Sequence, residues 1–189
     1  MAILFPEDDG TYAVFGKNYL PEKTVEEAGN DHYRGWAVTG SLTVTDGGMI
    51  DFGRIEDDIL DLAREHEVAE VAYDPFQASM LVQRLSAAGI SVIEYAQNVR
   101  NMSDPTKMLE GLINTHKLRH GFGPADTMTW MMSNVTGKLD AKDNIYPRKE
   151  RPENKIDGPV ALIAALGRSM AAEPKQAGSY LETSELLVL

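Results

Sequence analysis

Hydrophobic residues recur at helical spacing along residues 52–65, FGRIEDDILDLARE, with acidic residues on the other side. Ile55 and Ile59 mark the apolar face, so this segment is predicted to form an amphipathic helix. The run VAEVAY that follows predicts a buried strand ending at Asp74. A second helical pattern over residues 76–89, closed by a glycine, and the strand pattern ISVIEYA come next. This alternation predicts parallel strands covered by helices, in an α/β domain.

Two strand patterns precede this unit. MAILF and TYAVFGKNYL are separated by Asp9-Gly10, a pair typical of tight turns, which predicts two neighbouring strands. Residues 22–36 are polar and mixed, and we expect a peripheral helix and loop there.

Two helices are predicted in the next part of the chain. SDPTKMLEGLINTHKL predicts a helix with Asp104 as its N-cap and Pro105 at its first position. TMTWMMSNV, residues 127–135, is a shorter apolar segment, for which we favour a helix over a strand.

The last part of the chain has a polar segment followed by apolar ones. Residues 139–155 predict an irregular connection, with a turn at Asp143-Asn144, that leads to a helix beginning near Asp157. The tail, residues 173–189, ends in the apolar run ELLVL, and we expect it to dock on the body or on a partner.

Length and composition describe one folding unit. With 189 residues and 43% hydrophobic content the chain can bury a core, and we treat residues 1–172 as one domain followed by the tail. No apolar run approaches the roughly 20 residues of a membrane-spanning helix, so we expect a soluble, intracellular protein. The chain has no cysteine. A bound metal would therefore rely on carboxylates, histidines or carbonyls, which favours hard divalent cations.

The net charge of −11 argues at first against a nucleic-acid partner. However, residues 1–74 hold 17 of the 29 acidic residues and only 5 of the 18 basic ones. Within eight residues farther on lie Arg148, Lys149, Arg151 and Lys155, which could form a basic edge. On charge alone a solvated loop remains the alternative interpretation.

Asp74 and Asp157 are the candidate metal ligands. Asp74 follows a buried strand, and ligands gather at the carboxyl ends of strands in α/β sheets. Asp157 opens a helix 83 residues later. Paired carboxylates can hold two Mg²⁺ or Mn²⁺ ions that activate water and stabilise the leaving oxygen of a phosphodiester. The alternatives are a turn-forming Asp-Pro at the first position and an N-cap at the second.

Other candidate sites are weaker. His116 and His120 are four residues apart, as on one helix face in a zinc site, but no Glu follows His116 and no third ligand is evident. We favour exposed or capping histidines. Trp36, Trp130 and the methionines near it are interpreted as core. The chain lacks a Gly-rich phosphate loop with Lys and Ser or Thr, which leaves an ATPase unsupported.

Seven segments, in their order and spacing, resemble the C-terminal nuclease domain of tailed-phage terminase large subunits: YLPEKTVEE, VAYDPFQASMLVQRLSAAGISV, MSDPTKMLEGLI, HKLRHG, TWMMSNV, DNIYPRK and KIDGPVALIAALGR. The resemblance covers about residues 3–170. It implies an RNase H-like fold, with a mixed sheet flanked by helices. It also implies an endonuclease that uses two Mg²⁺ or Mn²⁺ ions to cut concatemeric double-stranded viral DNA during packaging.

The resemblance also assigns roles by position. It implies that Asp74 and Asp157 are catalytic, metal-binding acids. Asn134 and Lys107 match recurrent family positions without a role that their chemistry reveals. The implied partners are double-stranded DNA, the portal and the small terminase subunit, in the cytoplasm of a bacterial host of a phage or prophage. The residues expected near the DNA backbone are Arg148, Lys149, Arg151 and Lys155.

One family feature is missing. The family places a leading Asp in a DLS-like first strand, upstream of MAILF, and this chain starts too late to contain it; Asp8 and Asp9 are poor substitutes. We therefore expect impaired metal binding and little autonomous cleavage. We also expect an exposed sheet edge that promotes homo-oligomerisation. The alternatives are a non-catalytic module that docks to the packaging motor or portal, and a resolvase-type nuclease acting on branched DNA.

Overall fold

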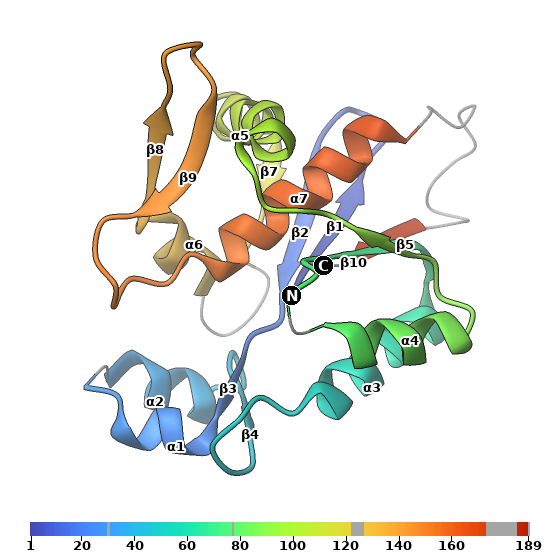
Figure 1. Ribbon diagram of the computed structural model, residues 1–189, viewed down its shortest axis with the longest axis vertical. Coiled ribbons are helices and arrows are strands. Elements are labelled where there is room, and N and C mark those ends of the chain that lie inside the picture. The colour runs from blue at the N-terminus through green and yellow to red at the C-terminus, as the bar shows by residue number, and fades with distance from the viewer. Residues whose placement is uncertain (30, 77, 122–126, 173–184, 189) are drawn as a thin grey trace.

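The computed structural model describes residues 1–29, 31–76, 78–121, 127–172 and 185–188 (Figure 1). Its main sheet has six strands in the order β6-β5-β10-β1-β2-β7. β1 is antiparallel to both neighbours, whereas β5 is parallel to both β6 and β10. The predicted mixed sheet flanked by helices is confirmed. The strands are β1 (Ala2–Pro6), β2 (Tyr12–Gly16), β5 (Glu67–Tyr73), β6 (Val92–Glu94), β7 (Leu118–Arg119) and β10 (Glu185–Val188).

Helices cover both faces of this sheet, and the side chains of β1 alternate between the two faces. Ala2 and Leu4 pack in the core that two helices share on one face, while Ile3 packs in the core on the other face. The side chains alternate because successive residues of a β-strand point to opposite faces of the sheet. The first core lies under α5 (Val99–Asn114) and α7 (Asp157–Ala171), and the second under α3 (Phe52–Glu65) and α4 (Ser79–Ala87).

A small lobe stands apart from the main sheet (Figure 1). Its core holds Val25, Tyr33 and Leu42, and Trp36 and Trp130 pack against them. Trp130 belongs to α6 (Thr127–Met132), so the lobe rests on that helix. Both tryptophans are partly buried and pack against this core, in agreement with their interpretation as core residues. The lobe comprises β3 (Tyr19–Pro21), α1 (Glu22–Glu27), α2 (Asp31–Val38) and β4 (Thr43–Thr45).

A buried carboxylate ties the lobe to α3. Asp58 is 4% exposed, and Lys17 Nζ lies 2.6 Å from its carboxylate. The Tyr19 hydroxyl donates to it at 2.8 Å, and Arg54 lies 3.3 Å away. Burial alone would raise the pKa of Asp58, but the hydrogen bonds and charges of these three residues lower it below the ordinary value.

Asp58→Asn is expected to lower the free energy of unfolding by about 2 kcal/mol at pH 7, because it leaves two cations without their carboxylate. Since the pKa of Asp58 is lowered in the folded state, its contribution is present above the unfolded value of about 3.9 and is lost as the pH falls through the folded value. Urea unfolding should therefore separate the two proteins at pH 7 and bring them together in acid. A constant difference at every pH would contradict this.

The helix predicted to begin at Asp104 begins earlier, and that prediction is wrong. α5 is capped by Asn98, whose side chain accepts the Asn101 N–H at 3.0 Å, and Pro105 lies inside the helix. Pro105 has no N–H to donate to the Asn101 carbonyl. The Tyr95 hydroxyl donates to that carbonyl instead, at 2.6 Å. A side chain from outside the helix thus supplies the missing bond, which no local pattern reveals.

The polar connection predicted over residues 139–155 is partly a β-hairpin. β8 (Val135–Leu139) pairs antiparallel with β9 (Ile145–Lys149). The turn between them contains Asp143, with a φ of +58°, so the predicted turn is confirmed. The strands were missed because most residues of the hairpin are polar and no apolar alternation marks them.

The sheet edge expected to be exposed beside β1 is occupied. β10 lies between β1 and β5, with Val188 opposite Ile3 on one side and Val71 on the other. The end of the tail thus docks on the body, and the expected exposed edge is wrong. Among the described strands the edges of the main sheet are β6 and β7, so oligomerisation through β1 loses its structural basis. Within the described ranges, no helix has the length and apolarity to cross a membrane.

Candidate metal and nucleic-acid site

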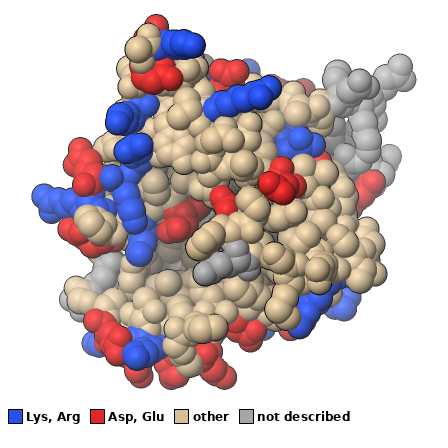
Figure 2. Space-filling view, viewed as in Figure 1, with Lys and Arg blue, Asp and Glu red and all other residues tan. Residues whose placement is uncertain are grey.

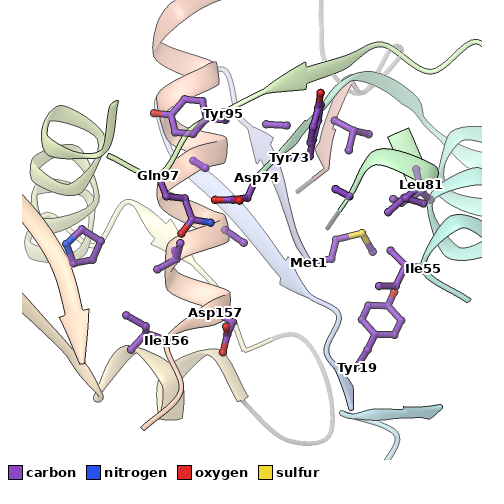
Figure 3. A pocket seen from close by; sticks show the side chains of 18 of the residues that line it. Met1, Tyr19, Ile55, Tyr73, Asp74, Leu81, Tyr95, Gln97, Ile156 and Asp157 are labelled. Atoms are coloured by element: carbon purple, nitrogen blue, oxygen red, sulfur yellow. The ribbon is translucent and has the colours of Figure 1, made fainter. Parts of the chain in front are cut away.

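A cavity of about 700 Å³ opens where β5 and β6 end, between the sheet and α7 (Figure 3). Ile55, Ile59 and Leu81 form part of an apolar wall on the side of α3 and α4. The polar side of the same cavity carries the groups that could act chemically. They are Tyr73, Asp74, Gln97, Tyr146, Arg148, Lys149 and Asp157.

Asp74 stands directly after β5, at the carboxyl end of the strand. Its Oδ1 accepts the N–H of Phe76 at 2.9 Å, which is the turn that an Asp-Pro sequence favours. The side chain is half-buried and lines the cavity, where it points toward Gln97 (Figure 3). The same carboxylate therefore stabilises the turn and lines the cavity.

Asp157 is the first residue of α7, but its carboxylate is not the cap of that helix. The N-cap position is Ile156, whose side chain makes no capping hydrogen bond. The Gly158 N–H donates to Met131 Sδ at 3.4 Å, and Pro159 has no N–H to satisfy. The Asp157 carboxylate is exposed and lines the cavity beside Ile156 (Figure 3). The start of α7 thus leaves this carboxylate available for a ligand.

The two acids line one cavity, Asp74 from the sheet and Asp157 from α7. Across the described residues, no group of three or more Asp, Glu or His side chains is placed to hold a metal ion. Two carboxylates suit Mg²⁺ or Mn²⁺, because such ions bind through one or two carboxylates and keep several water ligands. The donor set fits a hydrated hard cation and does not fit an ion enclosed by protein ligands.

The predicted basic residues divide into two pairs. Arg148 and Lys149 line the cavity, whereas Arg151 and Lys155 follow β9 and are not among its lining residues. None of the four forms a salt bridge with a described residue. Figure 2 shows Lys and Arg side chains gathered on the side of the molecule that carries the hairpin and the entry to α7. By contrast, ion pairs hold Arg54, Arg64, Arg84, Arg119 and Arg168.

A second cavity, of about 500 Å³, adjoins the first along the hairpin. The two share Gln97, Tyr146 and Arg148, and the second adds Asn98 and Lys138. The Tyr146 hydroxyl donates to the Gln97 carbonyl at 3.0 Å, which joins β9 to the segment before α5. Cationic side chains therefore continue from the acidic pair along the hairpin.

Several polar residues of the first cavity were not predicted, among them Tyr73, Gln97 and Tyr146. Gln97 follows β6 at its carboxyl end, so the rule that drew attention to Asp74 could have identified it. Tyr73 directly precedes Asp74 and could have been found in the same way. Tyr146 reaches the cavity because residues 135–149 form a hairpin, whose turn the sequence predicts but whose strands no apolar alternation marks.

The structure shows what Asn134 and Lys107 interact with. Asn134 Nδ2 donates to the Lys155 carbonyl at 3.1 Å, just before α7. Lys107 lies near the hairpin turn. There, hydrogen bonds from Asn144 and Lys142 lower the pKa of Asp140, and the positive charge of Lys107 lowers it further.

The two histidines do not share a helix face. α5 ends at Asn114, His116 follows it with a φ of +56°, and β7 separates it from His120. Both side chains are exposed. This agrees with the interpretation as exposed or capping residues.

Comparison with known proteins identifies relatives of nearly the whole chain. Residues 1–173 match the family described as terminase large subunit, endonuclease domain. The chain is 38% identical over 157 residues to Protein YmfN of Escherichia coli (strain K12), covering 82% of this chain and 34% of that protein. It is 28% identical over 178 residues to the large terminase subunit of Enterobacteria phage HK97, covering 92% of this chain and 35% of that protein.

A solved structure is also similar. The crystal structure of the HK97 bacteriophage large terminase superposes with a TM-score of 0.78 at 27% identity, over 88% of this chain and 36% of that one. The chain thus spans about a third of the length of these relatives.

Proposed function

Because the chain belongs to the endonuclease domain family of terminase large subunits, we propose that it cuts double-stranded viral DNA during packaging. The observation that carries the proposal is the cavity itself, whose lining includes Asp74 and Asp157 together with Arg148 and Lys149. Carboxylates for a hard cation and positively charged side chains for phosphate are the two components that phosphodiester hydrolysis needs.

The proposed division of labour follows from charge. Asp74 and Asp157 would hold two Mg²⁺ or Mn²⁺ ions. Arg148 and Lys149 hold the phosphodiester against the acidic pair, and Arg151 and Lys155 contact the backbone farther along. When bound, the cations lower the pKa of a water ligand and stabilise the leaving oxygen.

We further propose that these 189 residues alone cleave DNA slowly. The described part of the cavity offers two carboxylates. Mg²⁺ and Mn²⁺ lose water ligands reluctantly, so a site with few protein ligands binds them weakly. The proposed setting is the cytoplasm of a bacterial host, with the portal and the small terminase subunit as partners.

The nuclease assignment is tested with supercoiled plasmid and Mn²⁺. We expect slow nicking that a chelator abolishes and that shows no preference for branched DNA. Preference for branched substrates would favour a resolvase instead. Absence of both DNA binding and nicking, with chelator-insensitive capture of portal protein, would favour a docking module and overturn the proposal.

The basic residues are tested through the salt dependence of DNA binding. Arg148→Ala/Lys149→Ala is expected to reduce the slope of log affinity against log salt by about 2, because each lost phosphate contact removes about one released counterion. Fluorescence anisotropy with a duplex in Ca²⁺ measures this. The matched control is Lys23→Ala/Arg64→Ala, which removes two exposed cations that have acidic partners elsewhere. An equal change of slope in the control would contradict the assignment.

A further inference from the structure

The C-terminal end of α6 touches the chain on both sides of Asp157. We propose that Met131, in α6, and Asn134, just after it, are positioning residues that hold the Asp157 carboxylate in the cavity. The inference rests on the proposed metal-binding role of Asp157 and adds what fixes that side chain in place.

Two hydrogen bonds bracket Asp157. Asn134 Nδ2 donates to the Lys155 carbonyl at 3.1 Å, two residues before it, and Met131 Sδ accepts the Gly158 N–H at 3.4 Å, one residue after it. Both anchors act on backbone atoms, so the Asp157 side chain is left for the cavity. The thioether is a weak acceptor, but Met131 is only 6% exposed, so little water competes for the N–H.

Gly158 allows the close approach that this arrangement needs. A Cβ at position 158 would lie 2.5 Å from Met131 Cε and 3.3 Å from Met128 Sδ. Gly158 is itself buried, and the side chains it meets belong to the helix that supplies the anchor. A side chain here would displace the end of the Met131 side chain, and with it the sulfur that accepts the Gly158 N–H.

α6 is in turn held by the rest of the molecule. Asn18 Nδ2 donates to the Thr127 hydroxyl at 2.8 Å, at the start of the helix. Trp130 packs edge-on against Trp36 of the small lobe, with ring centroids 5.1 Å apart. The helix therefore connects the lobe to the position of Asp157.

The test follows the side-chain carboxyl carbons of Asp74 and Asp157 by NMR while Mn²⁺ is added to the whole chain. In the wild type both signals should broaden over the same range of Mn²⁺. In Gly158→Ala the Asp157 signal should reach the same broadening only at a roughly tenfold higher Mn²⁺ concentration. A loss of affinity of this size is typical when a residue that supports a metal ligand is removed. Asp74 should stay the more responsive of the two.

A second variant separates positioning from stability. Gly158→Ala/Met131→Ala removes the Met131 atoms that the new Cβ would meet and, with them, the sulfur that accepts the Gly158 N–H. The Asp157 response should therefore stay as weak as in Gly158→Ala although this close contact is relieved, and the protein should unfold more easily because a buried side chain is truncated. If Met131 served stability alone, relieving the contact would restore the Asp157 response.

Two further variants complete the test. Asn134→Asp keeps the shape but cannot donate to the Lys155 carbonyl when ionised, and should also weaken the Asp157 response. Gly111→Ala is the matched control, since its Cβ would meet no described residue within 4 Å apart from its own turn of helix. Wild-type broadening of Asp157 in folded Gly158→Ala and Asn134→Asp would overturn the positioning roles alone. Absence of broadening in the wild type would overturn the metal site and this inference together.

Discussion

Asp157→Asn is expected to weaken Mn²⁺ binding by this chain roughly tenfold or more, and Asp74→Asn should do the same. Asparagine keeps the shape of each side chain and removes the negative charge that offsets the dehydration of a hard cation. Because the described cavity offers only these two carboxylates, neither loss can be shared among further acids. Titration of free Mn²⁺ by electron paramagnetic resonance measures the change.

Both variants should fold normally, which makes the result interpretable. Asp157 is exposed and does not cap α7, and an asparagine at position 74 can still accept the Phe76 N–H. We expect changes in unfolding free energy within about 0.5 kcal/mol. The control is Asp104→Asn, which removes an exposed carboxylate of α5 outside the cavity. Equal Mn²⁺ affinity in the wild type and in both cavity variants would refute the assignment of these acids.

Gly167→Ala is expected to lower the free energy of unfolding by about 3 kcal/mol, although Ala normally favours a helix over Gly. A Cβ at this position of α7 would overlap the Tyr95 hydroxyl oxygen and lie 2.9 Å from Pro105 Cγ. Displacing Tyr95 would also break its hydrogen bond to the Asn101 carbonyl. Pro105 cannot replace that bond, so a polar group in the packed α5–α7 contact would lose its partner.

Urea unfolding measures the effect, and a second glycine provides the control. Gly111→Ala lies in α5 with open space around the new Cβ, and should stabilise the protein by about 0.5–1 kcal/mol. The two changes are chemically identical and should have opposite signs. Gly167→Ala/Tyr95→Phe should recover part of the loss, because it removes the overlapping oxygen. Stabilisation by both single variants would show that α5 and α7 pack less closely than the structure describes.

The sequence by itself determined the elements whose patterns are periodic and local. The helix over residues 52–65, the strand that ends at Asp74 and the helix that begins at Asp157 were all predicted. Each depends on the spacing of apolar residues and on a turn or helix-start residue within a few positions. The two candidate acids could be named for the same reason, whereas Arg148 and Lys149 were named from a local cluster of basic residues and from the family resemblance.

Only the tertiary structure decided how these parts meet. Pro105 can lie inside α5 because Tyr95 satisfies the carbonyl that proline leaves open, and β10 enters the sheet because β1 and β5 offer it backbone partners. The Asp157 carboxylate does not cap α7, because Met131, distant in sequence, accepts the Gly158 N–H. These contacts join residues that are far apart along the chain or outside the element concerned, so no local periodicity records them.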